Sequence, residues 1–262
     1  MRIVTWNINS VRLRMPLLRR LAENTAPDVV CLQETKVADE QFPHDDIEDL
    51  FPFRRINGIK AYNGVAILSK RPFQASGALE WCDRADGRHA FIRFAGGLEI
   101  HNFYVPSGGD VPDPDENPKF AHKLDFLDEI TAWWAEHASP RARRVLVGDL
   151  NIAPGEHDVW SHKQLLDVVS HTPVEVERLG RLLATHHWID TARHFVPDDE
   201  KLYSWWSYRA RDWRASNRGR RLDHIWVTPP LEAKLKSFEI FADARDWQKA
   251  SDHVPVIVDL DI

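Results

Sequence analysis

The chain has 262 residues, of which 43% are hydrophobic and 28% are charged, and its formal net charge at pH 7 is −6. This composition is typical of a soluble globular protein, and the negative charge argues against a protein that binds nucleic acid over its whole surface. No apolar run is long enough to cross a bilayer, so we expect no contact with a membrane. There are only two cysteines and no secretory signal, which predicts a cytoplasmic protein without a disulfide framework.

The charge is unevenly distributed along the chain. Between Arg209 and Arg221 there are six arginines and one aspartate, a local charge of +5, so the other residues carry −11. One basic segment on an acidic body indicates a directed anionic partner. The alternative is a solvated loop that needs no partner. A stretch so rich in arginine is not expected to be mostly buried.

Polar side chains end the first predicted strands. The segment 2–8 alternates as a strand that reaches Asn7, and the apolar run 28–34 ends in Glu34. Ser10 precedes an amphipathic pattern and could cap a helix there. Further strands are predicted at 65–68, 90–94 and 98–105, with Gly96-Gly97 as the hairpin turn between the last two.

The second half of the chain mixes long helices with further strands. The segment 106–118 is rich in proline and acidic residues, which predicts a loop, and the apolar spacing from 120 to 134 predicts an amphipathic helix. Thr172 and Glu175 form a capping box that opens a second helix, expected to reach about 186. After a loop-rich region at 196–220, strands are expected at 223–227 and 254–260. We find no repeat or linker, so a single domain, residues 1–262, with mixed sheets covered by helices is predicted.

The stretch from Arg144 to Pro154 has the pattern of a strand that is buried on both faces and then ends abruptly. Asp149 and Asn151 follow its apolar run two positions apart, and an extended chain would point both side chains the same way. Taken alone, such a strand end is more often a turn than a catalytic site.

Several other predicted strands also end in hard oxygen ligands. Asn7 and Glu34 lie at such ends, the basic segment leads into Asp223, and Asp252-His253 precedes the last strand. If these ends converge, they bring together carboxylates and amides with one histidine and no cysteine. That set of ligands favours Mg²⁺ or Mn²⁺ over Zn²⁺. Each position alone is equally well explained by a helix cap or by a strand end that meets solvent.

Taken together and in order, these motifs resemble the exonuclease III family of apurinic/apyrimidinic (AP) endonucleases, within the endonuclease–exonuclease–phosphatase superfamily. The resemblance covers essentially the whole chain and implies an α/β fold, a four-layer α/β sandwich with two mixed β-sheets packed face to face and helices outside. The matching motifs are Thr5-Trp6-Asn7, Leu32-Gln33-Glu34-Thr35-Lys36, Tyr62-Asn63-Gly64-Val65-Ala66-Ile67, Tyr104-Val105-Pro106, Gly148-Asp149-Leu150-Asn151-Ile152-Ala153-Pro154, Ser204-Trp205-Trp206-Ser207-Tyr208-Arg209, Arg221-Leu222-Asp223 and Ser251-Asp252-His253.

The resemblance implies a role for each matching residue. Glu34 matches the principal metal ligand, with Asn7 beside it and Asp252 as a ligand of a second site. The full set of implied metal contacts is Asn7, Glu34, Asp149, Asn151, Asp252 and His253. The implied catalytic residues are Asp149, which orients or deprotonates the attacking water; Asn151, a contact to the scissile phosphate; Tyr104, which contacts the phosphate or assists the leaving group; and His253, a phosphate ligand held by Asp223.

The resemblance also assigns contacts to DNA. Trp205 and Leu222 match positions that line a pocket for a flipped-out abasic sugar, and Asn217 matches a residue near the phosphate. Arg220 stands where some relatives carry an aromatic wall, which predicts a more polar pocket. With Arg209, these residues form the predicted nucleic-acid contacts; the rest of the arginine–tryptophan pattern is Trp206, Arg211, Trp213, Arg214, Arg218 and Arg221.

Three departures from the family pattern carry expectations of their own. Ser107 replaces an asparagine of many relatives and reaches less far toward a phosphate. Asn9 replaces an aspartate, which is expected to weaken metal coordination near Asn7. The acidic loop 110–116 is expected to face away from DNA because its charge would repel a phosphate backbone.

These observations predict a Mg²⁺-dependent repair enzyme, active also with Mn²⁺, that acts as a monomer on double-stranded DNA with abasic sites or 3′ ends. It would cleave 5′ to abasic sites and also act as a 3′→5′ exonuclease and 3′-phosphatase. One alternative keeps the chemistry but takes a lipid or inositol phosphoester, and another is a secreted general deoxyribonuclease; the arginine–tryptophan segment argues against the first and the missing signal against the second. A third alternative, a non-catalytic DNA-binding module, predicts the loss of a carboxylate that this chain retains.

Overall fold

A computed structural model describes residues 1–210 and 212–262. Arg211 of the predicted basic segment therefore lies outside the described residues. The first of two six-stranded sheets runs in the order β13-β14-β1-β2-β4-β3. Its strands are β1 (Arg2–Asn7), β2 (Val29–Gln33), β3 (Phe53–Asn57), β4 (Val65–Ser69), β13 (Leu235–Ile240) and β14 (Val256–Leu260).

The second sheet runs in the order β5-β6-β7-β8-β12-β9. Its strands are β5 (Ala75–Gly77), β6 (His89–Arg93), β7 (Leu98–Tyr104), β8 (Arg143–Asp149), β9 (Ile189–Asp190) and β12 (Asp223–Val227). Both sheets are mixed, because β1 pairs parallel with β2 and β7 pairs parallel with β8 while the neighbouring pairs are antiparallel. A short ribbon, β10 (Trp205–Trp206) with β11 (Gly219–Arg220), stands apart from both sheets.

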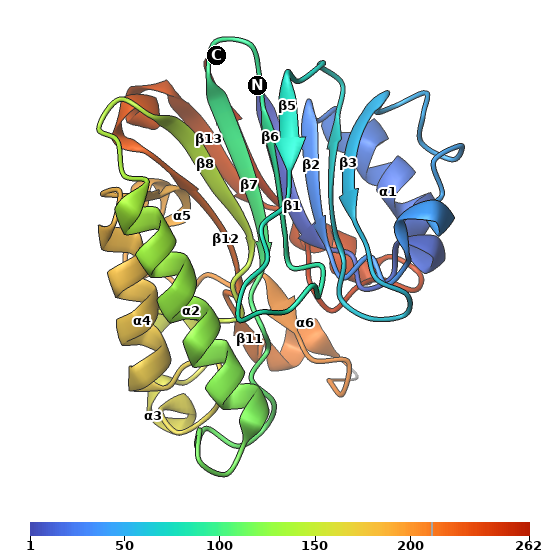
Figure 1. Ribbon diagram of the computed structural model, residues 1–262. Helices are drawn as coiled ribbons and strands as arrows, with labels where there is room; N and C mark the ends of the chain where they lie inside the picture. Colours follow the sequence, from blue (N-terminus) through green and yellow to red (C-terminus); the bar gives the residue numbers. More distant parts are fainter. Residues whose placement is uncertain (211) are drawn as a thin grey trace.

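The helices lie outside the two sheets. They are α1 (Val11–Thr25), α2 (Pro118–Glu136), α3 (His162–Leu165), α4 (Pro173–Ala184), α5 (Thr191–Phe195) and α6 (Trp213–Ser216), with single turns η1 (Asp39–Gln41), η2 (Glu156–Asp158), η3 (Pro229–Lys234) and η4 (Ala242–Asp246). α1 covers the outer face of the first sheet, and α2 and α4 lie side by side over the second (Figure 1). None of the described helices combines the length and the apolar character that a membrane crossing requires.

Strand alternation produces the layers. In β1, Ile3 packs between the two sheets, whereas Val4 and Trp6 pack on the side of α1. In β8, Val145 packs between the sheets and Leu146 packs under α2. Because successive side chains of a strand point to opposite faces, each central strand contributes to two apolar layers. The predicted four-layer sandwich is confirmed.

The helix predictions are mostly confirmed, with one error. α4 opens on the capping box, in which the Glu175 carboxylate accepts hydrogen bonds from the backbone N–H and hydroxyl of Thr172. α1 also begins where expected, but Ser10 does not cap it. The φ angle of Ser10 is 85° and its hydroxyl makes no capping hydrogen bond. Its backbone instead serves the turn after β2, where its N–H donates to the carbonyl of Glu34.

A buried amide bridge joins the two sheets next to the ends of the central strands. Gln33, the last residue of β2, donates from Nε2 to Oδ1 of Asn102 in β7 at 2.7 Å. Nδ2 of Asn102 donates to the backbone carbonyls of Leu32 and Ala66 in the other sheet. Because buried amides are held in place by such bonds, the bridge fixes the sheets relative to each other where Glu34 leaves β2.

Candidate active site

The strand register brings the predicted site residues to one edge of the sandwich. Asn7 pairs with Gln33 across the parallel strands β1 and β2, which places Glu34 one residue beyond. In the second sheet, Asp149 of β8 pairs with Tyr104 on one side and with Asp223 on the other. This edge is the one near β11 and α6 (Figure 1). The convergence inferred from the strand ends therefore does occur.

Asn7 connects the two sheets within the site. Its Nδ2 donates to Oε1 of Glu34 at 2.9 Å and to Oδ2 of Asp149 at 2.8 Å. The hydroxyl of Tyr104 donates to the same Oε1 of Glu34 at 2.8 Å. Burial raises the pKa of Tyr104 well above its ordinary value, so the hydroxyl keeps its proton and remains a donor near neutral pH.

Asp149 and Asn151 lie together, but not in the way that an extended chain would place them. Asn151 has a φ angle of 53°, in the left-handed region, so the chain turns immediately after β8. The backbone N–H of Asn151 donates to Oδ1 of Asp149 at 3.0 Å, and its Nδ2 donates to the carbonyl of Val105 at 2.9 Å. The extended geometry expected from the spacing is therefore wrong; an Asx-type turn folds the amide back onto the carboxylate.

Gly148 makes this close approach of β7 and β8 feasible. A Cβ atom at that position would lie 1.9 Å from the backbone oxygen of Phe103, and the φ angle of Gly148 is 147°. Any side chain would push the strands apart one residue before Asp149.

His253 and Asp223 form a buried pair beside Asp149. Nδ1 of His253 lies 2.8 Å from Oδ2 of Asp223, which also accepts the hydroxyl of Ser204 at 2.6 Å. Nε2 of His253 lies 3.6 Å from Oδ2 of Asp149. Burial opposes the charge of the imidazolium, but the two carboxylates outweigh burial and raise the pKa of His253. Burial raises the pKa of Asp149, an effect that His253 only partly opposes.

The oxygen ligands near Glu34 fit a hard divalent cation. The carboxylates of Glu34 and Asp252 both line the cleft. Oε2 of Glu34 is 2.6 Å from the ammonium of Lys36, which also donates to Oδ1 of Asn9 at 2.7 Å. Asn9 in turn donates from Nδ2 to Oδ1 of Asp252 at 3.2 Å. Carboxylate and amide oxygens converge here without sulfur, which suits Mg²⁺ or Mn²⁺. Asn7 would have to turn its amide to join them, because its nitrogen faces Glu34.

A second group that could hold a cation consists of Asp149, Asp223 and His253, whose ligand atoms lie within 4.8 Å of one another. Its imidazole is already engaged by Asp223 at Nδ1. Only Nε2 is left for another ligand, and the raised pKa of the ring favours a proton on that nitrogen. This favours His253 as a donor to an anion, while Glu34 and Asp252 line the cleft as candidate metal ligands.

A cleft of about 730 Å³ reaches this site; His253 lines one end of it, whereas Asp149 and Asp223 are buried and are not among its lining residues. Tyr104, Asn151 and His253 lie at this end with Glu34 and Asp252. The rest of the lining includes the buried Leu222 and two tryptophans, Trp160 and Trp205; Trp205 also contacts the carboxylates, because its indole N–H donates to Oδ2 of Asp252 at 3.0 Å. Arg209, Arg218 and Arg220 also line the cleft. The part with Glu34 and Asp252 is called the acidic end below, and the part with the arginines the basic end.

The arginines of the predicted basic segment fall into two classes. Arg214 pairs with Asp243 and Asp246 on the surface. Arg221 is 1% exposed and pairs with Asp158 and Asp190, so neither is free to hold DNA. The expectation that the stretch is not mostly buried is confirmed for its described residues, among which only Gly219 and Arg221 are buried. Within the described part of the chain, Arg209, Arg218 and Arg220 form no ion pair with a carboxylate.

The cleft arginines are held by aromatic rings and by backbone. The guanidinium of Arg218 lies 4.7 Å from the ring centre of Trp160, and that of Arg220 lies 5.4 Å from Trp205. Arg220 also donates to Oγ of Ser170 at 2.6 Å. Burial lowers the pKa of Arg220, with Glu175 as the opposing charge. The ring of Trp206 is buried in the core of the first sheet, as considered from the sequence.

Other predicted contacts are placed differently. Asn217 is exposed at the end of α6, where its Oδ1 accepts the indole N–H of Trp206 at 3.1 Å, and it is not among the residues that line the cleft. Ser107 does line it. So does Asp110, the first residue of the acidic loop. The expectation that this loop faces away from the site is therefore wrong at its beginning.

The sequence reasoning missed Lys123. Its side chain is fully buried and its ammonium donates to the backbone carbonyl of Asn151 at 2.8 Å. The signal was present in the sequence, because Lys123 occupies an apolar position of the amphipathic helix, three residues after Phe120 and next to Leu124.

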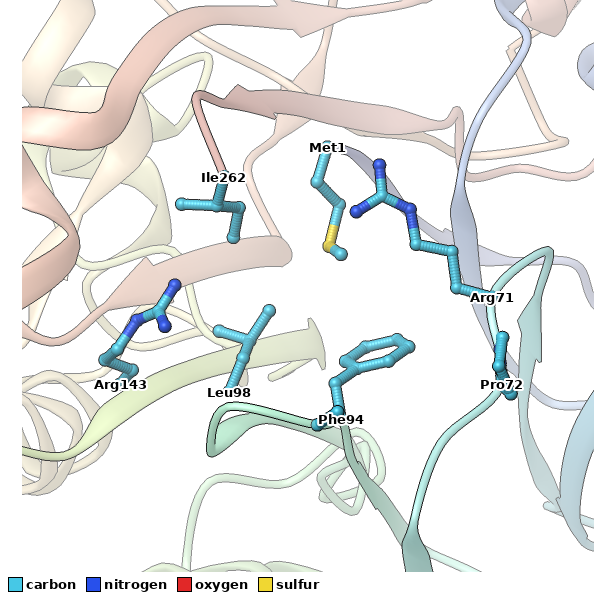
Figure 2. Close-up of a pocket in the computed structure, with 8 residues that line it drawn as sticks. Met1, Arg71, Pro72, Phe94, Leu98, Arg143 and Ile262 are labelled. Atoms are coloured by element: carbon cyan, nitrogen blue, oxygen red, sulfur yellow. The ribbon is translucent and has the colours of Figure 1, made fainter.

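A separate cavity of about 330 Å³ lies at the opposite edge, near the two ends of the described chain. Met1, Phe94, Leu98 and Ile262 supply its apolar wall, and Arg71 and Arg143 point toward it (Figure 2). It is lined by no carboxylate side chain among the described residues, so it lacks the chemistry of the first cleft.

Comparison with known proteins agrees with this geometry. The profile of the Endonuclease/Exonuclease/phosphatase family matches residues 4–253. The chain is similar to an exodeoxyribonuclease III of Haemophilus influenzae, with 29% identity over 98% of both chains. It is also similar to an exodeoxyribonuclease of Bacillus subtilis, with 30% identity over 98% of both chains.

Solved structures give the same picture. An AP endonuclease from Archaeoglobus fulgidus has a TM-score of 0.92 and 28% identity over the full length of both chains. The 3′ phosphatase NExo from Neisseria, bound to a product DNA hairpin, has a TM-score of 0.91 and 29% identity over the same extent.

Proposed function

Because the chain belongs to the exonuclease III family of the endonuclease–exonuclease–phosphatase superfamily, and is thus a metal-dependent DNA-repair nuclease, we propose that it cleaves the phosphodiester bond 5′ to abasic sites in duplex DNA. The observation that supports this most directly is one cleft in which His253, paired with the buried Asp223 and Asp149, lies with Glu34, Asp252, tryptophans and arginines. An enzyme that holds a flipped-out sugar next to its phosphate needs both kinds of group in the same cleft.

Each group at the acidic end has a task in this reaction. Glu34 and Asp252, with amide oxygens of Asn7 or Asn9, would hold Mg²⁺ or Mn²⁺, which neutralises charge on the scissile phosphate. Asp149, whose pKa burial raises toward the range useful for proton transfer, orients the attacking water and accepts its proton. Protonated His253 donates from Nε2 to a phosphate oxygen while Asp223 holds its Nδ1 proton.

Asn151 and Tyr104 complete this end of the cleft. The amide of Asn151 donates to the carbonyl of Val105 and, at 3.3 Å, to Asp149, so it would exchange the longer bond to donate to the phosphate. The hydroxyl of Tyr104 keeps its proton and would turn from Glu34 to donate to the leaving 3′ oxygen or to the phosphate. Both groups are held in the cleft beforehand, so only these donor exchanges accompany the developing charge.

The other end of the cleft would receive the abasic nucleotide. Its apolar floor at Leu222 and the ring of Trp205 suit a sugar without a base, while Arg209, Arg218 and Arg220 suit phosphates of the same strand. Flipping costs least where no base pairs or stacks, so an abasic site enters more readily than an intact nucleotide.

Activity at 3′ ends belongs to the same proposal. One structural relative is a 3′ phosphatase, and a terminal phosphate needs only the acidic end of the cleft. We therefore expect 3′-phosphate removal and 3′→5′ exonuclease activity from the same residues, with the protein acting as a monomer.

The deciding experiment uses a duplex with one tetrahydrofuran abasic analogue and a label at the 5′ end. We expect a nick on the 5′ side of the analogue with Mg²⁺ or Mn²⁺ and none with a chelator, while the matched duplex without a lesion shows only shortening from its 3′ end and no internal cut at that position. Internal cutting of both duplexes at equal rates, or of neither, contradicts the proposal. A third duplex ending in a 3′ phosphate measures the terminal activity in parallel.

A further inference from the structure

A fully buried ion pair lies behind the cleft. Lys123 of α2 and Glu175 of the first turn of α4 are both 0% exposed, and Nζ of Lys123 lies 2.5 Å from Oε1 of Glu175. Removing two charges from water costs several kcal/mol each, and an apolar pair in the same place is often as stable or more so. Stability alone therefore does not account for this pair, and its other hydrogen bonds indicate what else it does.

Lys123 holds two turns that line the cleft. Its ammonium donates to the backbone carbonyl of Asn151 at 2.8 Å and to that of Ser107 at 3.3 Å. Asn151 is in the left-handed region, which disfavours a residue with a side chain. Anchoring its carbonyl stabilises this conformation, and the conformation directs the amide of Asn151 toward Asp149.

Glu175 holds the opposite wall. Its two carboxylate oxygens accept the backbone N–H of Ser170 at 3.0 and 2.9 Å. Ser170 is also in the left-handed region, with a φ angle of 87°. The hydroxyl of Ser170 accepts a hydrogen bond from Nη1 of Arg220, and its carbonyl accepts the N–H of Ala153 at 2.8 Å. The Glu175 carboxylate thus fixes Ser170, and the hydroxyl of Ser170 in turn holds the guanidinium of Arg220.

These contacts connect both ends of the cleft through one buried pair. We propose that Lys123 and Glu175 are positioning residues that fix the phosphate contact at Asn151 and the sugar-side wall at Ser170 and Arg220 as one rigid unit. The roles of Asn151 and Arg220 in this inference rest on the proposed function. The pair itself touches neither DNA nor metal; it acts through the backbone of the residues that do.

The test replaces both members together. Lys123→Met with Glu175→Gln removes the charges while keeping the side chains close in size, so no unpaired charge remains buried. A matched control is Asp128→Asn, which removes the ion pair from Asp128 of α2 to Arg178 of α4 on the outer side of the same two helices. Glu175→Asp is the second test variant, because it keeps both charges but shortens the side chain by one methylene group, which draws the carboxylate away from its partners.

Three quantities are measured on each folded variant: kcat and KM on the abasic duplex, and the hydrogen-exchange rate of the Ala153 amide. We expect the double variant to lose about 100-fold in kcat, the loss typical of a misplaced catalytic group, with KM changed by less than about threefold. Exchange of the Ala153 amide should become at least about tenfold faster. Glu175→Asp should lie between the wild type and the double variant, and Asp128→Asn should match the wild type.

Two results would overturn the inference: an unchanged kcat and unchanged exchange in the double variant, or equal losses in Asp128→Asn, which would show a general effect of weaker helix packing. If the double variant does not fold, Glu175→Asp decides by the same measurements. If the wild type itself fails to cut the abasic duplex, the proposed function fails, and the exchange of Ala153 still decides whether the pair fixes the two walls.

Discussion

The two ends of the cleft treat charge in opposite ways. At the acidic end, the charged groups pair with one another: Glu34 with Lys36, and His253 with Asp223 and, at 3.6 Å, with Asp149. At the basic end, Arg218 and Arg220 lie against tryptophan rings and form no ion pair within the described residues. Coupled groups can tune proton transfer but offer little net attraction, whereas uncompensated cations attract a polyanion. We therefore assign catalysis to the acidic end and affinity for DNA to the basic end.

Arg220 and Arg221 differ in whether carboxylates neutralise their charge. They are neighbours in the chain, yet Arg221 forms a buried network with Asp158 and Asp190, while Arg220 faces the cleft. Successive side chains of an extended chain point to opposite sides, which accounts for the different surroundings of these two neighbours. One arginine is therefore part of the scaffold, and the other is available for substrate.

The largest expected effect is at the acidic end. Asp149→Asn removes the group that accepts the proton of the attacking water, so kcat on the abasic duplex should fall by about 1,000-fold or more. Its affinity for the same duplex, measured by fluorescence anisotropy in Ca²⁺, should change by less than about threefold. A comparable loss of affinity would contradict the assignment of catalysis to the acidic end and of DNA affinity to the basic end. Asp125→Asn, on the exposed face of α2, is the matched control.

Next comes the scaffold arginine. Asp158→Asn leaves Arg221 buried with only part of its network, and we expect the free energy of unfolding to fall by roughly 3–5 kcal/mol, measured by urea denaturation. Asp198→Asn removes only an exposed partner of Arg193 at 3.8 Å, and should change stability by less than about 0.5 kcal/mol. Equal stability of the two variants would mean that Arg221 is not held as the network indicates.

The same carboxylate predicts a pH dependence. Burial would raise the pKa of Asp158, but Arg221 and Arg193 outweigh burial and hold it below its ordinary value of 3.8. The ionised form is therefore favoured by folding, and its contribution is complete above the unfolded pKa and is lost as pH falls through the lower folded one. The stability difference between wild type and Asp158→Asn should stay constant from pH 8 to about 5 and shrink below about pH 4. A difference that grows on acidification would reverse the assigned sign.

A smaller effect is expected at the basic end. Arg220→Met keeps apolar contact with Trp205 but removes one uncompensated cation. The slope of log Kd against log salt concentration should fall by about one unit, and binding at low salt should weaken several-fold. The corresponding surface variant, Arg214→Met, loses a cation that Asp243 and Asp246 already neutralise. The salt slope of Arg214→Met should match that of the wild type. If the slope of Arg220→Met also matches the wild type, Arg220 does not contact the DNA.

The smallest change concerns Asp110, the acidic residue at the cleft. Asp110→Asn removes a charge that repels phosphate, and we expect DNA binding to tighten by roughly two- to threefold. Asp115→Asn, an exposed change in the same loop that does not line the cleft, should leave the affinity unchanged. Identical effects of both changes would indicate only a general dependence on net charge.

The sequence predicted those site residues that local patterns of apolar and polar residues mark. Strand ends carrying Asn7, Glu34 and Asp149 could be predicted from apolar runs that stop at polar residues, and the order of the motifs, including the one with Asp223, resembled a family. The turn at Asn151 could not, because a spacing of two residues predicts an extended chain unless the left-handed conformation is known. Lys123 was missed because a lysine in an amphipathic helix is usually solvated.

By itself, the sequence determined the layers and the kinds of chemical group available, since alternation and helical spacing decide which side chains are buried in each element. It also determined that six arginines lie between residues 209 and 221. Only the tertiary structure decided that Asp158 and Asp190 neutralise Arg221 while Arg220 is left to the cleft, and that Lys123 finds Glu175. Those pairings join segments far apart in the chain, and electrostatic compensation depends on distance in space, which local sequence does not contain.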